Sequence, residues 1–360
     1  MKRLLWFGVY DLSFPRTRML QAELRKRGIV VEECRVDPRK SKWKFSELWK
    51  QGRTFRGNTF DAVVVGYPGA HIVWLAKLLF RAPIVYDAGF SVYQAEVEDR
   101  RSCKPRSLRA ARLYVMEWLA VRLADVIILD TRAHVEYFCQ LFGTRSKKFF
   151  TLDVGADTDI FFAREDVSPA HDAFTAVFYG SFIPLHGVET ILDAAALLRD
   201  RADIRFRLVG NGQTTPDMRR LADARALTNV LFTGRVPQTS VEGPSVLGEI
   251  RSADLLLGIF GSGRKAQMQV PLKVFEAMAC AKPIVTADTP AVRELLVPDR
   301  DLVVVPSGDG AALAAAIVSL KNDPTRRAAL AAHGHATFEK RFRPERLCDR
   351  FLSEMNRLLS

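Results

Sequence analysis

Cysteine and long apolar runs are the two features that this sequence has least of. The five cysteines of the 360-residue chain are odd in number, lie far apart and form no C-x-x-C pair. This usage argues against a disulfide framework or a zinc site and favours a reducing cytoplasm. No segment reaches the roughly 18 uncharged apolar residues of a membrane-spanning helix. The apolar run near the start is too short for a secretory signal. We therefore expect a cytoplasmic protein.

Positive charge is concentrated in the first half of the chain, which carries a net charge of +12 overall. It is densest at residues 39–57, where seven basic side chains and one acid are interleaved with Trp43, Phe45, Trp49 and Phe55. One interpretation is peripheral contact with an anionic membrane surface, to which each nearby Lys or Arg contributes about 1 kcal/mol. The other is a solvated basic helix with a few core aromatics. No recognised nucleic-acid module is present, so we expect no nucleic-acid partner.

Short apolar runs alternate with amphipathic stretches along the whole chain, which is the pattern of βαβ units. The pattern restarts after a loose stretch near residues 162–172. The expected parallel strands are Leu4–Val9, Ala62–Val65, Pro83–Tyr86, Val126–Leu129, Ala176–Tyr179, Ile204–Val209, Val230–Thr233, Leu255–Ile259 and Pro283–Thr286. We expect an α/β fold with two doubly wound domains, residues 1–165 and 166–335, and a C-terminal helix within 336–360 that packs back toward the first domain. Such sheets bind ligands at the carboxyl ends of their strands.

The segment 258–286 carries the most specific chemical pattern. A glycine-rich turn is followed by the cations Arg264 and Lys265, and then Pro271 begins a helix that carries Lys273 and Glu276. A helix start offers free N–H groups and partial positive charge, which suit a diphosphate. Lys273 and Glu276 are three residues apart and share one face. The lysine can bind a phosphate, and the glutamate can accept hydrogen bonds from a ribose diol. The alternative interpretation is that the two residues form only a surface ion pair.

Three further strands end in turns that could approach a ligand. Gly180, Ser181 and His186 lie in a loop before a clean amphipathic helix, although a lone histidine in a turn is more often only solvated. The other two turns contain Gly210 with Gly212, and Arg235 with Val236. A G-x-G turn after a strand is weak evidence by itself.

Together these segments resemble the retaining glycosyltransferases of family 4, also called glycosyl transferases group 1. The resemblance is carried by VGADTDIFF at 154–162, the loop from Gly180 to Gly187, GNG at 210–212, GRVP at 234–237 and KVFEAMACAKPIVT at 273–286. It implies the GT-B fold, with two facing Rossmann-like domains and a cleft between them.

The resemblance also implies roles for the motif residues in binding a nucleotide sugar. The nucleobase would lie along Arg235 and Val236, the ribose on Glu276, and the diphosphate near Gly180, His186 and Lys273. Catalysis would proceed with retention at the anomeric carbon and without a cofactor or metal. The acceptor would be a glycan or, as the basic and aromatic residues at 39–57 suggest, a lipid-linked sugar.

This sequence departs from the family pattern at several positions. Met268 stands where many members have a first glutamate, and Ser181 and His186 replace an arginine and a lysine. Arg264 and Lys265 are candidates to replace the lost charge.

The N-terminal half matches the family more loosely. Arg16 and Arg18 lie in the loop expected after the first strand, and Asp87 takes the place of a family histidine. Arg16 can equally be a solvated cation and Asp87 a cap residue. Asp157 and Asp159 spell a D-x-D metal motif, but Asp157 fits the interdomain segment better. A non-catalytic nucleotide-sugar-binding protein and a sugar-nucleotide epimerase remain the alternative functions.

Overall fold

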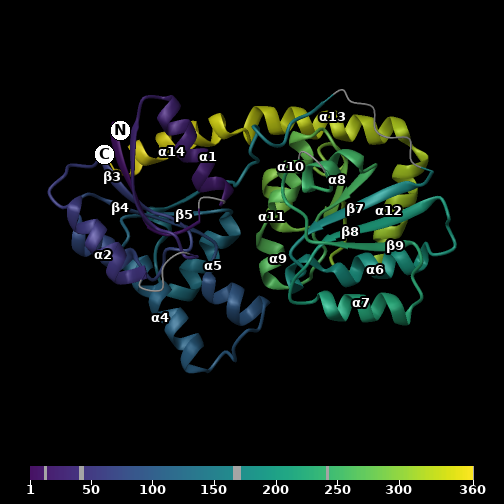
Figure 1. Cartoon of the computed structure of the whole chain (residues 1–360), viewed down its shortest axis with the longest axis horizontal. Coiled ribbons are helices and arrows are strands. Elements are labelled where there is room, and N and C mark those ends of the chain that lie inside the picture. The colour runs from purple at the N-terminus through teal and green to yellow at the C-terminus, as the bar shows by residue number, and fades with distance from the viewer. Residues whose placement is uncertain (12–13, 40–43, 165–171, 241–242, 360) are drawn as a thin grey trace. The chain divides into compact units, whose positions relative to one another are not determined.

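The chain folds into two compact units. The computed structural model describes residues 1–11, 14–39, 44–164, 172–240 and 243–359. One unit comprises Met1–Val154 with Pro344–Ser360, and the other comprises Gly155–Arg343 (Figure 1). The division falls earlier than the expected boundary at 165 because Ala156 and Phe161 pack in the core of the second unit. The expected C-terminal segment 336–360 is itself divided between the two units.

The first unit is built on a six-stranded parallel sheet with the order β2-β1-β3-β4-β5-β6. Its strands are β1 (Arg3–Val9), β2 (Val30–Val36), β3 (Ala62–Val65), β4 (Ile84–Gly89), β5 (Val126–Leu129) and β6 (Phe149–Thr151). The four central strands are nearly continuous apolar runs because helices cover both faces of the sheet. The edge strand β2 is half-exposed and rich in charge, so its sequence does not read as a buried strand.

The second unit has a second six-stranded parallel sheet, with the order β12-β11-β10-β7-β8-β9. Its strands are β7 (Phe174–Gly180), β8 (Ile204–Gly210), β9 (Val230–Gly234), β10 (Leu255–Leu257), β11 (Ile284–Ala287) and β12 (Val303–Val305). This is the strand order of dinucleotide-binding domains, in which the chain direction across the sheet reverses at the first strand. The first sheet has the other common doubly wound order, which begins 2-1-3-4-5. Both units are therefore doubly wound α/β domains, as the sequence predicts.

Helices cover the sheets of both units (Figure 1). The first unit contains α1 (Pro15–Lys26), α2 (Lys44–Thr54), α3 (Val73–Leu79), α4 (Leu108–Leu123), α5 (Arg132–Phe142) and α14 (Pro344–Leu359). The second contains α6 (Val188–Leu197), α7 (Thr215–Ala224), α8 (Val246–Ser252), α9 (Arg264–Met268), α10 (Leu272–Ala279), α11 (Pro290–Leu295), α12 (Gly310–Asn322) and α13 (Pro324–Arg341). None of the helices formed by the described residues combines the length and apolar character that crossing a bilayer requires.

The last helix, α14, completes the core of the first unit. Leu347, Phe351 and Met355 form one apolar stripe and are buried in the same cluster as Trp6 of β1. The rings of Trp6 and Phe351 lie 6.4 Å apart. The C-terminus thus packs on the N-terminal sheet, and its spacing of three and four residues explains why it is helical.

The residues of β7 alternate between the two cores of the second unit, and this alternation positions the candidate site. Phe178 belongs to the cluster that includes α6 and α12, whereas Tyr179 belongs to the cluster that includes α10. Successive side chains of a strand point to opposite faces. Gly180, two residues after Phe178, therefore faces the same side of the sheet as Phe178.

Candidate functional site

The glycine-rich turns of the second unit meet where its sheet changes direction. β7 and β10 are neighbours in the sheet, and the chain leaves them toward opposite edges. Gly180 ends β7, and Gly261 lies in the turn that follows β10. Ligands of open parallel sheets bind at the carboxyl ends of the strands at such a point. The topology therefore predicts a ligand-binding site at this edge of the sheet.

The turns after β7 and β8 are in direct backbone contact, which only glycine permits here. A Cβ added at Gly210 would lie 1.9 Å from the carbonyl oxygen of Gly180, and one added at Gly212 would lie 2.5 Å from the nitrogen of Phe182. The N–H of Thr214 also donates to the carbonyl of Phe182 at 2.9 Å. The predicted glycines Gly180, Gly210 and Gly212 are thus packed closely together at the ends of β7 and β8.

The turn that carries His186 is locked to the turn after β10 in the same way. A Cβ at Gly187 would lie 2.3 Å from the nitrogen of Gly261. The N–H of Phe260 donates to the carbonyl of His186 at 3.0 Å. The ring of His186 is buried and packs edge-on against Phe178, with centroids 5.5 Å apart. These contacts fix the position of the histidine.

Lys273 of α10 reaches across the end of β7 through the space that Gly180 leaves open. A Cβ at Gly180 would lie 3.1 Å from Nζ of Lys273 and 3.2 Å from Cε1 of His186. Nζ lies 4.0 Å from the ring centroid of Phe178. Lys273 is only 5% exposed, and among the described residues its Nζ has no hydrogen-bond partner. Lysine, histidine and glycine therefore converge at one point.

Burial changes the proton affinity of this lysine. Loss of water lowers the pKa of Lys273 to about 7, a shift that the nearby Glu276 opposes. A desolvated ammonium is costly unless an anion pairs with it. An anion placed beside Nζ would restore the charged form, so the geometry suits a ligand that brings its own negative charge.

Glu276 lies one helical turn after Lys273 and is held by Tyr179. The hydroxyl of Tyr179 donates to Oε2 of Glu276 at 2.7 Å. Glu276 is 6% exposed, and burial raises its pKa to about 7 although the tyrosine hydrogen bond and Lys273 act in the opposite direction. Tyr179 was not predicted as a site residue; its place directly before Gly180, facing α10, was the available signal.

Comparison with known proteins identifies this part of the chain. Residues 173–323 match the family model described as "Glycosyl transferases group 1". These residues are a group 1 glycosyltransferase domain. The family recognition made from the motifs is thereby confirmed over this range.

Curated relatives of this glycosyltransferase domain carry matching names. A D-inositol 3-phosphate glycosyltransferase of Thermobispora bispora is 26% identical over 274 residues, which are 72% of this chain and 61% of that protein. The lipopolysaccharide core biosynthesis glycosyltransferase LpsD of Rhizobium meliloti is 28% identical over 196 residues, which are 54% of this chain and 53% of that protein. The chain thus spans between half and two thirds of the length of these two relatives.

A solved structure shows the fold of the whole chain. Anabaena Alr3699/HepE, in complex with UDP-glucose, aligns with a TM-score of 0.74 at 18% identity. The alignment covers 99% of this chain and all of HepE. This likeness confirms the predicted GT-B class of fold.

The other residues predicted to bind the donor lie less close to Lys273, His186 and Gly180. Arg235 is exposed after the edge strand β9, and Val236 packs against the core. Ser181 and Arg264 are exposed, whereas Lys265 and Met268 are buried. α9, which carries the last three, packs through Ala266 against Leu185 in the histidine turn. The replacement of lost charge by Arg264 and Lys265 stays a prediction.

In the first unit, Arg16 and Asp87 form a buried ion pair. Arg16 is 1% exposed and Asp87 0%, and Arg16 also pairs with Asp130 and donates to the carbonyl of Leu152 at 3.0 Å. Loss of water raises the pKa of Asp87, while Arg16 opposes that shift; burial also raises the pKa of Asp130 to about 6. Asp87 therefore presents no surface for direct contact in this conformation, and its predicted catalytic role is untested.

The expected loop position of Arg16 and Arg18 is wrong. Both residues lie in the first turn of α1, because Pro15 stands at the first position of that helix, where its missing N–H costs no hydrogen bond. Arg16 consequently points into the unit, and Arg18 is half-buried.

A row of aromatic side chains at the carboxyl end of the first sheet was not predicted. Phe14 stacks on Tyr67 with centroids 5.0 Å apart, Tyr67 lies 5.1 Å from Phe90, and Phe90 lies 6.5 Å from His134. They follow β1, β3, β4 and β5 in turn. Only the parallel order of the strands brings together residues so far apart in sequence.

The D-x-D sequence serves a local turn. An oxygen of Asp157 accepts a hydrogen bond from the N–H of Asp159 at 3.0 Å. Within the parts of the chain that the structure describes, no group of three or more His, Cys, Asp or Glu is arranged to hold a metal ion. The metal independence expected from the sequence stays a prediction.

Proposed function

We propose that this chain is a glycosyltransferase that uses a nucleotide-sugar donor, held by its C-terminal unit. The observation that best supports this function is the buried Lys273 beside Gly180 and His186, whose Nζ has no hydrogen-bond partner in the described part of the chain. Glu276 lies one turn away, and both residues belong to the range that matches the group 1 glycosyltransferases. The diphosphate binds at Nζ of Lys273 and the first N–H groups of α10. The ribose hydroxyls bind to the carboxylate of Glu276, whose second role is to accept the Tyr179 hydrogen bond.

The proposed reaction places developing negative charge where this unit holds positive charge. The bond between the anomeric carbon and the diphosphate oxygen breaks, and the acceptor oxygen forms a bond to that carbon on the same face. The acceptor proton passes to a diphosphate oxygen, and a nucleoside diphosphate leaves. Fixed donors and cations at the leaving group lower the barrier without a metal ion. Retention of configuration belongs to this proposal.

Product analysis tests the reaction directly. Purified protein is incubated with UDP- and GDP-sugars, with and without a glycan or lipid-linked acceptor, and products are resolved by mass spectrometry and NMR. We expect acceptor-dependent sugar transfer, with the anomeric proton coupling of a retained linkage. Isomerised donor without acceptor would indicate an epimerase, and tight binding without any product would indicate a non-catalytic protein.

The metal requirement has its own test. With excess EDTA, turnover should stay within about twofold of the untreated rate, because the proposed charge stabilisation comes from Lys273 and the start of α10. Complete loss that Mg²⁺ or Mn²⁺ restores would contradict the metal-independent mechanism.

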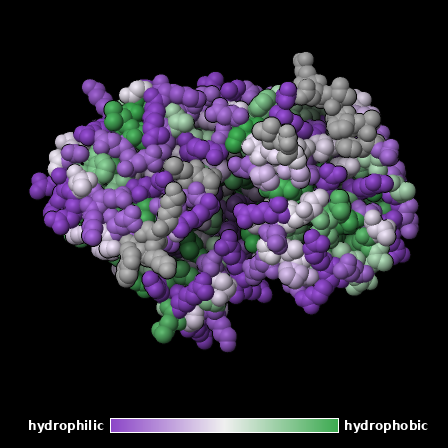
Figure 2. All heavy atoms as spheres, in the orientation of Figure 1, coloured by the Kyte–Doolittle hydropathy of each residue, from purple (hydrophilic) through white to green (hydrophobic). Residues whose placement is uncertain are grey.

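We further propose that the acceptor lies on the first unit and is lipid-linked. The exposed aromatic and basic residues of α2, Phe45, Trp49, Lys50 and Arg53, are continued by exposed apolar residues on the neighbouring α3 and α4. Those residues are Trp74, Leu78, Leu108, Val115, Trp118 and Leu119. Figure 2 shows hydrophobic side chains at the surface of the first unit near α4. Aromatics beside cations suit a headgroup layer. Trp43, which belongs to the predicted segment, lies outside the described residues.

Vesicle binding tests this surface. The protein should sediment with vesicles that contain anionic lipid and not with neutral ones. Replacing Lys50 and Arg53 by Gln should weaken that binding by about 2 kcal/mol, whereas the same change at the exposed Arg219 and Arg220 should not. Equal sedimentation of both variants would remove α2 from the proposed surface.

A further inference from the structure

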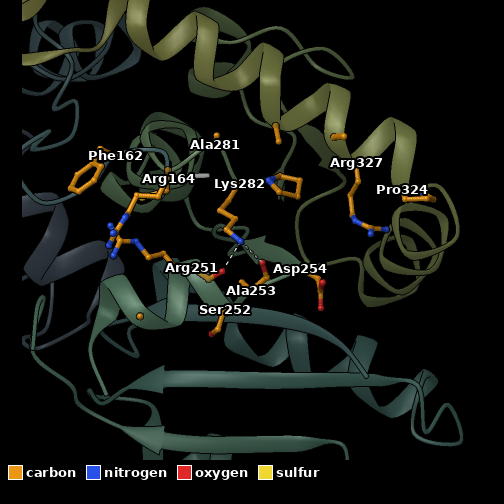
Figure 3. A pocket seen from close by; sticks show the side chains of 15 residues that line it. Phe162, Arg164, Arg251, Ser252, Ala253, Asp254, Ala281, Lys282, Pro324 and Arg327 are labelled. Carbon is orange, nitrogen blue, oxygen red and sulfur yellow. Dashed lines mark hydrogen bonds between the residues drawn. The ribbon is translucent and has the colours of Figure 1, made fainter. Parts of the chain in front are cut away.

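A cationic pocket lies at the other end of the second sheet from the glycine turns. Its volume is about 440 Å³, and its lining comes from the ends of α8 and α10, the starts of β10 and β11, and the first turns of α13 (Figure 3). Asp254 and Pro283 lie directly before β10 and β11, so the pocket opens at the amino ends of these strands. A volume of this size suits a small ligand.

The charge of the lining is strongly one-sided. Arg164, Arg251, Lys282 and Arg327 contribute four cations, and Asp254 is the carboxylate among the lining residues. One oxygen of Asp254 is already used, because it accepts the N–H of Thr175 at 2.8 Å. The lining residues therefore carry more positive than negative charge.

Two of these cations are committed to backbone carbonyls. Nζ of Lys282 donates to the carbonyls of Arg251 at 2.6 Å and Ala253 at 3.1 Å, closing the end of α8. Arg327 donates from Nη1 to the last carbonyls of α12, at Leu320 and Lys321. Both side chains thus hold the walls while adding positive potential.

Arg251 offers guanidinium donors that can act on a ligand. Its Nε and Nη2 are removed from solvent and have no hydrogen-bond partner among the described residues. Its guanidinium carbon lies 5.2 Å from the ring centroid of Phe162, so the group is oriented by stacking. Figure 3 shows Arg164 and Arg251 extending to the same side of the pocket in this view. A guanidinium edge with free N–H groups matches a phosphate or diphosphate.

We propose that this pocket binds a small phosphorylated ligand, at a site separate from the nucleotide-sugar site. The phosphate accepts hydrogen bonds from Nε and Nη2 of Arg251, and Arg164, Lys282 and Arg327 neutralise its remaining charge. The body of the ligand lies against Phe162 and Pro283. The proposal does not depend on the transferase activity.

Calorimetry with inorganic pyrophosphate tests the site. The background is Lys273→Met, so that binding at the donor site is weakened first. We expect saturable pyrophosphate binding that Arg251→Gln weakens at least tenfold. The matched control is Arg199→Gln, at an exposed arginine of the same unit whose Nε lies 3.9 Å from a carboxylate oxygen of Asp200; it should leave the affinity unchanged. Equal affinities for the two variants, or no saturable binding at all, would overturn the proposal.

A second pair of variants covers the case in which Arg251→Gln does not fold. Ala328 is an exposed lining residue of α13. Ala328→Glu adds a carboxylate at the mouth of the pocket and leaves Arg251 in place, and Ala328→Gln adds the same bulk without charge. Pyrophosphate should bind the glutamate variant at least fivefold more weakly than the glutamine variant. Indistinguishable affinities would refute a phosphate site here.

Discussion

Nucleotide affinity should fall steeply as the pH rises above 7, because Lys273 must be protonated to bind a diphosphate. Burial lowers the pKa of this lysine to about 7 in the free protein, whereas an unperturbed lysine titrates near 10.4. A bound diphosphate favours the ammonium form and raises the pKa again. At pH 8 the lysine of the free protein is about nine-tenths neutral, so binding should take up about 0.9 proton per nucleotide.

The size of the loss in nucleotide affinity follows from the lowered pKa of Lys273. Lys273 binds its proton more tightly in the nucleotide complex than in the free protein. The nucleotide affinity is therefore highest below the pKa of the free protein, about 7, and it decreases as the pH rises above that value. Between pH 7 and 8.5 the affinity should fall about 15-fold, or about 1.6 kcal/mol. Titration calorimetry of UDP or GDP in buffers of different ionisation enthalpy measures both the affinity and the proton uptake.

The matched control is Lys273→Met, which keeps the length of the side chain and removes the titration. Glu276 also titrates near pH 7, so the informative quantity is the difference in slope between this variant and the wild type. A wild-type slope as flat as that of Lys273→Met would refute the reasoning. Zero proton uptake at pH 8 would refute it independently.

Three further predictions concern stability. Lys273→Met should raise the free energy of unfolding in urea at pH 7 by about 1–3 kcal/mol, since it removes a buried amine that has no hydrogen-bond partner among the residues described; a decrease would contradict this. Asp87→Ala should lower it by about 3–5 kcal/mol, because the buried guanidinium of Arg16 loses one of its two carboxylate partners and is left with Asp130, whereas an Asp87→Asn protein of native stability without turnover would favour direct catalysis. Gly210→Ala should lower the free energy of unfolding by about 3 kcal/mol through overpacking, and it should weaken nucleotide binding. Gly263→Ala, where the added Cβ meets nothing within 4 Å, should change stability little. Equal losses in the two variants would show that the close backbone contact at Gly210 is not what the substitution disturbs.

The central strands could be predicted because burial on both faces leaves a direct trace in the sequence. β2 could not, since Glu32, Glu33 and Arg35 on a half-exposed edge interrupt its apolar pattern. The glycine turns, Lys273 and Glu276 were predicted from residue type and from the family resemblance, and the structure brings them to one edge of the sheet. Spacing alone could not show that Lys273 crosses Gly180 to reach the ring of Phe178.

The ion pair of Arg16 with Asp87 and Asp130 lay beyond sequence reasoning for a different reason. Its members come from α1, β4 and the end of β5, and only the parallel pairing of the strands brings them together. A buried pair and an exposed catalytic pair have the same residue types, so the sequence does not distinguish them. The same holds for the aromatic row from Phe14 to His134.

A crystal structure with UDP, and a second with GDP, tests the central claim most directly. The account predicts the diphosphate within hydrogen-bond distance of Nζ of Lys273 and the N–H groups at the start of α10, with the ribose hydroxyls on Glu276. A nucleotide bound in the first unit, or a diphosphate that leaves Lys273 without contact in both crystals, would contradict it.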